Sequence, residues 1–419
     1  MRRHVIFVAS AWVLGLSGSA IAQQAKPDVL VEGPGIKVGE ATVLHPRVGL
    51  EAGVVSNVFY EQDEGFASAI MRLLAGMDIS PAGTDRLGEF ENTARTLEFR
   101  AGVEFVYTEF LSSNSDARGQ RNLGADAAVD ATFFPQGSVK FRLADKFVRV
   151  ARPVNFESDQ HLDRDINQAS AELTIQPRGR TLSGSLRYAN MIDFFESDAS
   201  RFANRIQHSF GARVNWKFFP YTQVWLDGQF SFIRSLEETN WKSGSSPLLI
   251  RTGIDSVLTE ATTVNAYLGY TNGFYEVGPS YNRLLGGVMF GWRYTPAGRI
   301  VLGYRYDVQD SINANYYGQH VGSLGLQQQI RAIMLDGALA AHFRGYRGVP
   351  MEVRMDPQRD DRDDFILAAH TRGSWVLQDR FSLYLDYVLE RLDTDFRTVD
   401  GDDPSYLRHE VVLGLGAAF

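Results

Sequence analysis

The chain has 419 residues, with 42 Lys and Arg against 50 Asp and Glu and a formal net charge of -8 at pH 7. This acidic balance argues against a nucleic-acid-binding protein, which needs concentrated basic surface. Cysteine is absent, which excludes a disulfide scaffold and a lipoprotein.

The first 22 residues have the features of a secretory signal peptide. Arg2 and Arg3 form a charged start, residues 5–16 are apolar, and Ala20-Ile21-Ala22 fits a small-x-small cleavage site. We predict that residues 1–22 are removed and that residues 23–41 form a short periplasmic leader. The leader is too small for a globular plug, and it could hang in the periplasm, lie in a lumen or contact a partner.

After the signal peptide, no apolar run approaches the length of a membrane-spanning helix. An exported chain without a helical anchor can still be a membrane protein, but only as a closed barrel. Glycine is abundant, at 39 residues, aromatic residues make up 12% of the chain, and helical periodicity with caps is almost missing. These features favour a β-protein.

From about residue 42 onward the sequence alternates between apolar and polar residues, as half-buried strands do. Two classes of connection also alternate. Short turns rich in Pro and Gly are expected at 134–137, 177–180, 220–222, 295–298 and 378–380. Longer polar connections are expected at 112–121, 153–165, 196–204, 236–246, 310–318, 348–364 and 393–404. Tight turns on one side and longer loops on the other are typical of outer-membrane barrels.

Periodicity alone cannot separate a soluble β-sandwich from a barrel, because the two differ only in which face meets water. The signal peptide, the C-terminal aromatic residue and a count of about 18 strands favour the barrel. We therefore predict an all-β fold: a transmembrane, antiparallel, up-and-down outer-membrane β-barrel over residues 42–419. An even strand number places both chain ends on the periplasmic side.

The last strand ends on an aromatic residue, as in the signal that the barrel-assembly machinery reads in outer-membrane barrels. Val411, Leu413, Leu415 and Phe419 share one face of this strand. The alternative is a core strand that happens to end the chain. We predict that these four residues form the assembly signal.

Motifs for catalysis are missing from the sequence. The histidines after the signal peptide are scattered, and there is no nucleophile elbow, zinc-protease motif or phosphate-binding loop. The acidic run of residues 356–364 lacks the spacing of a calcium loop, so it is read as a solvated external loop, with a divalent bridge to lipopolysaccharide phosphates as the alternative. We predict no enzymatic activity, no cofactor and no metal site.

The polar faces of the strands would line a hydrated lumen, since barrels of 16 to 18 strands leave one. Both signs of charge occur there, so strong ion selectivity is not predicted. Trp225, Tyr267 and Tyr384 would suit an uncharged or weakly acidic glycan. The candidate lumen-lining residues are Arg100, Glu104, Lys140, Arg142, Asp227, Arg251, Asp255, Arg305, Asp307 and Asp386.

Two segments carry a resemblance to a known family. The segment HPRVGLEAGVVSNVFY at residues 45–60 resembles the first strand of the family called β-barrel porin 2, and GYRYD at residues 303–307 resembles its recurring strand core. The likeness extends thinly over residues 42–419. It implies a role like that of the Wzp-type barrels of exopolysaccharide and capsule export, which work with a periplasmic polysaccharide export protein.

The expected function is therefore export of a polysaccharide through the outer membrane, in contact with lipopolysaccharide. The alternatives are a general diffusion porin for small solutes and a non-conducting structural barrel. A long inward-folding loop with opposed charge clusters would favour the porin, whereas neighbouring genes for glycosyltransferases and a polymerase would favour export. The leader and the external loop 348–364 are the segments expected to close the lumen.

Overall fold

A computed structural model describes residues 31, 33–39, 41–62, 65–81, 96–150, 163–177, 179, 181–237, 244–351, 355–356, 358–377 and 380–419. The predicted signal peptide and most of the predicted leader lie outside these residues. The strands are β1 (Ile36–Val38), β2 (Thr42–Val55), β3 (Ser68–Pro81), β4 (Leu97–Leu111), β5 (Asn122–Phe133), β6 (Val139–Val150), β7 (Arg164–Ile175), β8 (Leu182–Phe195), β9 (Arg205–Phe219), β10 (Thr222–Ser235), β11 (Leu248–Val257), β12 (Thr262–Asn272), β13 (Asn282–Thr295), β14 (Gly298–Asp310), β15 (Tyr316–Ile330), β16 (Ile333–Arg347), β17 (Asp361–Leu377), β18 (Phe381–Thr394) and β19 (Tyr406–Ala418).

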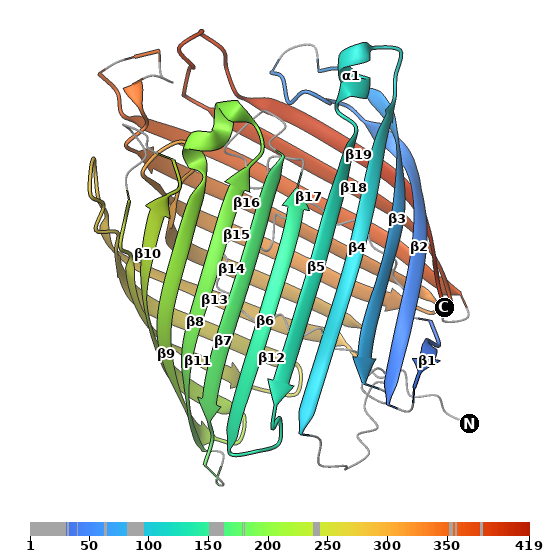
Figure 1. The fold of residues 1–419 in the computed structure, drawn as a ribbon, viewed down its shortest axis with the longest axis vertical. Coiled ribbons are helices and arrows are strands. Elements are labelled where there is room, and N and C mark those ends of the chain that lie inside the picture. The colour runs from blue at the N-terminus through green and yellow to red at the C-terminus, as the bar shows by residue number, and fades with distance from the viewer. Residues whose placement is uncertain are drawn as a thin grey trace.

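Each strand from β2 to β19 pairs antiparallel with the strand that follows it, and β19 pairs with β2 to close the barrel. At the closure, Val412 lies opposite Gly53 and Leu415 opposite Leu50. Figure 1 shows the strands tilted around one continuous wall. The prediction of a closed up-and-down barrel of about 18 strands is confirmed.

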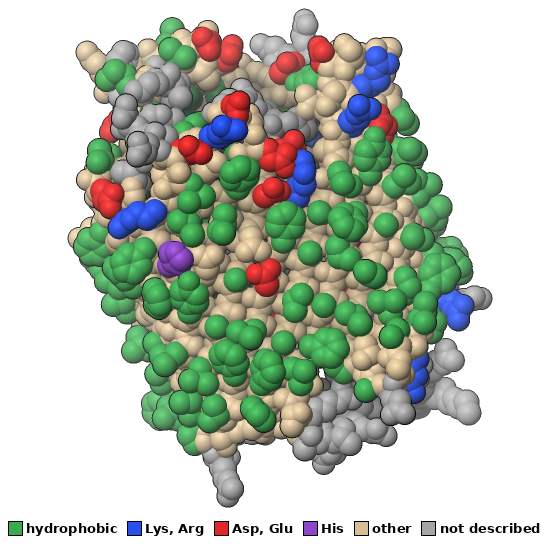
Figure 2. All heavy atoms as spheres, viewed as in Figure 1, with side chains coloured by type: hydrophobic (Ala, Val, Ile, Leu, Met, Phe, Trp, Pro, Cys, Tyr) green, Lys and Arg blue, Asp and Glu red, His purple; other side chains and the backbone are tan. Residues whose placement is uncertain are grey.

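The two faces of the wall have opposite character. On β19, Leu413 is 52% exposed on the outside, whereas its neighbour Val412 is 3% exposed and faces the lumen. Figure 2 shows the outer face as a broad band of hydrophobic side chains, with charged side chains gathered toward the end that bears the long connections. A charge within the band is Asp145, which accepts a hydrogen bond from Asn167 at 3.1 Å. An outward apolar band is what a strand wall in lipid requires.

Most connections follow the predicted alternation of short and long. The exception is the connection between β3 and β4, residues 82–96, which is long although it joins strand ends on the side of the short turns. One turn that carried no clear sequence signal joins β15 to β16 and consists of Arg331 and Ala332. Arg331 adopts a φ of +58° there, in the left-handed region. The longer connections include the helix α1 (Ser115–Gly119) and the 3-10 helix η1 (Asp198–Ala203). None of the helices in the described residues has the length and apolar character needed to cross a membrane.

The described part of the leader lies at the periplasmic rim beside the barrel closure. Its strand β1 pairs with β2, with Ile36 opposite Leu44 and Val38 opposite Thr42. On β2, residues 42–46 extend past the last residue of β19 that pairs with this strand, Ala418 opposite Arg47. The leader strand covers an edge that would otherwise present unpaired backbone groups.

Candidate functional site

All ten predicted lumen-lining residues lie on the inward face of the barrel. They stand in the opposite phase of their strands to exposed apolar residues such as Phe105, Val139 and Leu302. The structure brings two predicted pairs together. Arg251 Nη2 lies 3.0 Å from Asp227 Oδ1, and Arg305 Nε lies 2.9 Å from Asp307 Oδ2.

The other predicted lumen residues, apart from Lys140, contact groups outside the predicted set, so the wall is more fully paired than the sequence suggested. Glu104 pairs with Arg47 at 3.1 Å, Arg142 pairs with Asp130, and Arg100 lies 3.6 Å from Asp78. Asp255 accepts hydrogen bonds from Gln223 and Asn265 at 2.9 Å each, and Asp386 pairs with Arg372 at 2.7 Å and with His370. Lys140 lies beside Arg142 on β6.

Large lumen side chains lie flat along the wall because the directly paired residue on the next strand is glycine. A Cβ atom on Gly253 would lie 2.4 Å from the ring of Trp225, and one on Gly287 would lie 2.7 Å from the ring of Tyr267. Real Cβ atoms do not approach so closely, so only glycine admits these rings. The same relation holds for Arg251 over Gly269 and Tyr384 over Gly414. Arg187 also lies over a glycine, Gly211, at 3.2 Å from the position of a Cβ atom. The bulk of these side chains therefore follows the wall instead of filling the bore.

On β8 to β11, three arginines surround one carboxylate. We call Arg187, Arg213, Arg251 and Asp227 the arginine cluster. Asp227 is fully buried and pairs with Arg187 and Arg251. Arg213 lies opposite Asp227 on β9, and its guanidinium stacks over the ring of Trp225 at 4.3 Å. The cluster holds more positive than negative charge.

Two of the three predicted aromatic residues are covered by cations. Arg213 covers Trp225, and Arg372 lies over the ring of Tyr384 at 4.9 Å. Both rings are almost completely buried. At these two places the lumen presents guanidinium groups and not open aromatic faces, which the sequence pattern did not indicate.

Where the first and last barrel strands meet, a second group of charges is sealed. We call Glu51, Arg72, Glu390, Arg408 and Glu410 the seam network. Glu410 bridges the two arginines, and Arg72 pairs also with Glu51 at 3.0 Å and Arg408 with Glu390 at 3.2 Å. All five side chains are buried. The network ties β2 and β3 to β18 and β19 on the lumen side of the closure.

At the extracellular end, a chain of ion pairs crosses from one part of the wall to another. Asp193 pairs with both Arg164 and Arg205, and Arg205 pairs also with Asp310 at the end of β14. Strands β9 and β14 are five strands apart in the barrel, so this contact spans part of the opening. Phe195 and Ala203 pack with Ile312 in the same place.

Asn315 fixes the connections next to this chain. Its amide donates to the carbonyl oxygens of Val277 and Pro279 at 2.8 and 3.0 Å. The hydroxyl of Tyr275 lies 2.8 Å from Asp310 and 2.7 Å from the carbonyl oxygen of Asn315. Burial, together with Asp310, raises the pKa of Tyr275 well above its usual value, and burial raises the pKa of Tyr281 to about 12. Both phenols are therefore neutral at physiological pH, as hydrogen-bonded packing requires.

The inward-folded connections differ from the two segments expected to close the lumen. The described leader residues lie at the periplasmic rim, beside β2 and Ala418. Two other connections fold inward: Tyr60, between β2 and β3, packs on Ile366 and Tyr406, and Ala314, between β14 and β15, packs on Val349. Of the predicted loop, Val349 takes part in this packing.

The residues of the predicted assembly signal face outward. Val411, Leu413 and Leu415 are exposed on the outer side of β19, and the backbone N–H of Phe419 donates to the carbonyl oxygen of Pro46 at 3.0 Å. Their role in assembly remains a prediction.

Two arginines of the arginine cluster, Arg187 and Arg213, are missing from the predicted lumen-lining residues. The signal that could have found them is their place in the polar phase of their strands. Arg187 lies opposite Gly211, and Arg213 sits in phase with the polar residues of β9. Among the described residues, no group of three or more His, Asp or Glu side chains is arranged to hold a metal ion.

No family model matches the sequence, and no curated protein matches it. Solved structures share the fold. OccAB2 of Acinetobacter baumannii is 9% identical, with a TM-score of 0.50, over 90% of this chain and 98% of that one. OccK2 (OpdF) of Pseudomonas aeruginosa is 10% identical over the same shares, with a TM-score of 0.47. The FrpB iron transporter of Neisseria meningitidis is 8% identical over 90% of this chain and 81% of that one, with a TM-score of 0.42.

The closed wall, the outward apolar band and the shared fold lead to one conclusion. This chain is an outer-membrane β-barrel. An 18-strand wall with a polar inner face is porin-like in architecture. The comparisons do not extend to the family suggested by residues 45–60.

Proposed function

We propose that this barrel is a hydrated conduit for export of an acidic polysaccharide across the outer membrane. The observation that carries the proposal is the wall of β8 to β13, where Arg187, Trp225, Arg251 and Tyr267 lie flat over glycines. A chain of linked sugars needs a smooth, continuous path, and flat-lying side chains leave the bore to the polymer. Guanidinium groups bind carboxylates with matching planar geometry.

The contacts at the extracellular end fit the same role. A wide open lumen would leak small solutes, so an export conduit needs a closed resting state. The link from Arg205 to Asp310 and the packing of Ile312 on Ala203 span part of the opening. These contacts join the ends of β9 and β14 and the connections next to them, and not neighbouring paired strands, so they can separate while the strand pairing stays intact.

The proposed partner is a periplasmic polysaccharide export protein, which would deliver the polymer to the periplasmic rim. At that rim β1 exposes Ile36 and Val38, each about half accessible. The barrel would act by passage and not by catalysis.

A general diffusion porin is the second candidate. The observation that favours it is the same set of contacts at the extracellular end, from Arg205 to Asp310 and from Ile312 to Ala203. A constriction fixed by buried ion pairs would select small solutes by size. The fold shared with OccAB2 supports the barrel architecture and does not identify a solute.

Deletion of the gene separates the two candidates. We expect the deletion strain to lose one surface polysaccharide, measured by glycan staining of intact cells, while uptake of small solutes is unchanged. Complementation with Arg213→Glu should restore the folded barrel but export less of the acidic glycan. Complementation with Arg142→Gln, on the lumen side of β6, should restore export. Normal surface glycan together with slower solute uptake would assign the barrel as a porin.

A further inference from the structure

Every outward-facing histidine of the described strands is paired with a tyrosine on the preceding strand. The distance from the tyrosine hydroxyl to histidine Nδ1 is 2.9, 2.8 and 2.9 Å, and the rings are stacked with interplanar angles of 19°, 27° and 23°. The three pairs are Tyr188 with His208, Tyr304 with His320, and Tyr387 with His409.

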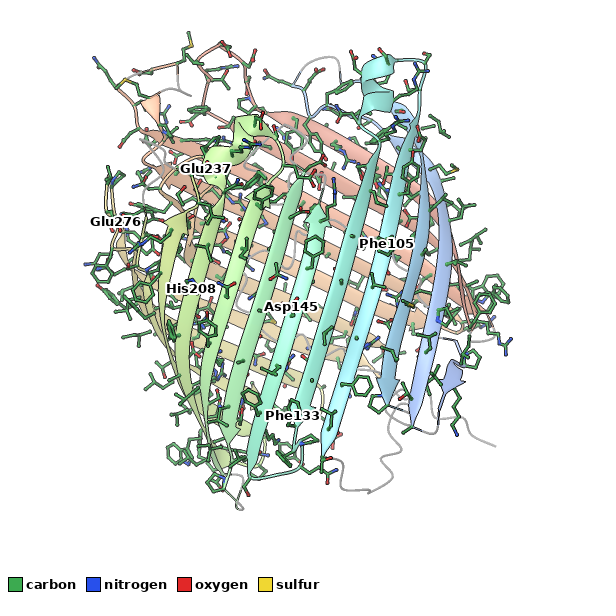
Figure 3. The ribbon with its side chains drawn as sticks, viewed as in Figure 1. Phe105, Phe133, Asp145, His208, Glu237 and Glu276 are labelled. Atoms are coloured by element: carbon green, nitrogen blue, oxygen red, sulfur yellow. The ribbon has the colours of Figure 1, made fainter. Side chains whose placement is uncertain are left out.

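The three pairs repeat one geometry. In each, the tyrosine lies on a strand that runs toward the long connections, and the histidine is two residues before the tyrosine's direct partner on the next strand. His208 and His409 are each the fourth residue of their strand, and His320 is the fifth. The pairs therefore lie at one level, near the extracellular ends of β9, β15 and β19. Figure 3 shows His208 on the outer face of the wall.

At one of the three pairs, a second contact defines which ring nitrogen of the histidine carries the proton. At His208, the amide nitrogen of Asn190 lies 3.3 Å from Nδ1. An amide nitrogen can only donate, so Nδ1 is the acceptor and Nε2 carries the hydrogen in the neutral ring. The tyrosine hydroxyl then donates to Nδ1 as well, which leaves the Nε2–H as a donor at the lipid-facing surface. Polar hydrogen at this surface needs an acceptor, because hydrocarbon offers none.

Arginines stand above two of the pairs on the same outer face. Arg347 lies opposite Tyr316, at the start of the strand that holds His320, and Arg391 lies opposite Leu407, two residues from His409. Both arginines are about half exposed and pair with carboxylates of the rim. Each arginine adds a cation on the extracellular side of its histidine donor, which suits a lipid headgroup that carries more than one oxyanion.

We propose that the three Tyr–His pairs are binding positions for phosphorylated glycolipids of the outer leaflet. A phosphate oxygen of the lipid accepts the hydrogen bond from histidine Nε2–H, and the tyrosine holds the ring in place. The pairs divide the circumference unevenly, at β8/β9, β14/β15 and β18/β19, so the barrel would order lipid at three separate points.

The test uses the full chain in phospholipid nanodiscs that contain lipid A with both phosphates, lipid A without phosphates, or no lipid A. Native mass spectrometry counts the bound lipid A molecules, and thermal unfolding reports their effect on stability. The variant H208F/H320F/H409F keeps the rings but removes the donor. The variant H208Q/H320Q/H409Q keeps an N–H donor, and W216F/W292F/W375F changes exposed aromatic residues of other positions on the outer face.

We expect the phenylalanine variant to lose affinity for phosphorylated lipid A by about tenfold, and the glutamine and tryptophan variants to keep most of it. Equal binding by the wild type and the phenylalanine variant, or equal binding of lipid A with and without phosphates, would overturn the proposal. If the triple phenylalanine variant does not fold, the three single variants should each lose one bound lipid. Retention of all bound lipids by the single variants would also overturn it.

Discussion

Two stretches of the lumen wall use buried charge in opposite ways. In the seam network, two arginines alternate with three glutamates, and every charged group has an opposite partner within the network. In the arginine cluster, three arginines share Asp227, and Arg213 rests on an aromatic ring. The first arrangement cancels charge where the barrel closes, and the second leaves positive charge where solute would pass.

The difference shows how one barrel wall can use buried charge for closure in one place and for contact with the solute in another. Removing one partner of a buried ion pair strongly destabilises the folded protein, because the remaining charge is left buried without a partner or water. We therefore expect that none of the charged residues of the seam network can be replaced without destabilising the barrel closure. Arg213 has the opposite property, since its removal leaves no unpaired acid behind.

The largest expected effect is at the seam. Arg72→Met would leave Glu51 and Glu410 buried without their shared cation, at a cost of about 3–5 kcal/mol in the free energy of unfolding. Urea unfolding in phospholipid vesicles measures this cost. The control is Arg142→Met, whose pair with Asp130 is about half exposed and should cost less than about 1 kcal/mol. Equal losses in the two variants would mean that the seam is no more than a solvated lumen wall.

The next effect concerns the glycines beneath the flat-lying side chains. Gly253→Ala would place a Cβ 2.4 Å from the ring of Trp225 and should destabilise the barrel by about 1–3 kcal/mol through overpacking. The matched control is Gly325→Ala, because a Cβ there meets its nearest atom at 3.8 Å. Thermal unfolding of both variants gives the comparison. If Gly253→Ala is as stable as its control, Trp225 is not held flat against the wall, and the smooth path proposed for the polymer does not exist there.

The fold was predictable because alternation and connection length are local properties of the sequence. Polar and apolar residues in alternate positions specify a two-faced strand, and the strand number follows from the turns. The turn at Arg331 was missed because its left-handed residue is neither Gly nor Asn. The glycine content was visible as a number, but its meaning depends on which residue each glycine faces across the sheet.

The candidate site was predictable only as a list of inward-facing residues. Asp227 and Arg251 were found because both follow the polar phase of their strands. The cluster needed strand register, since Arg187 reaches Asp227 from β8 to β10 over Gly211. The ion pair between Arg205 and Asp310 at the extracellular end could be found only from the tertiary structure, because the two residues are 105 positions apart and no local pattern links them.

The smallest expected effect on stability separates the arginine cluster most sharply from the seam. Arg213→Met should cost only about 0.5–1 kcal/mol, the worth of its contact with Trp225, and should lower the preference of the lumen for anions. One charge acting over about 10 Å in water-like surroundings is worth about 0.4 kcal/mol for each ion, with opposite sign for chloride and potassium, so their permeability ratio should fall about fourfold. The reversal potential in a potassium chloride gradient across a planar bilayer measures the ratio. An unchanged ratio would show that Arg213 is screened from the ion path, and the positive charge of this wall would then have no part in choosing the solute.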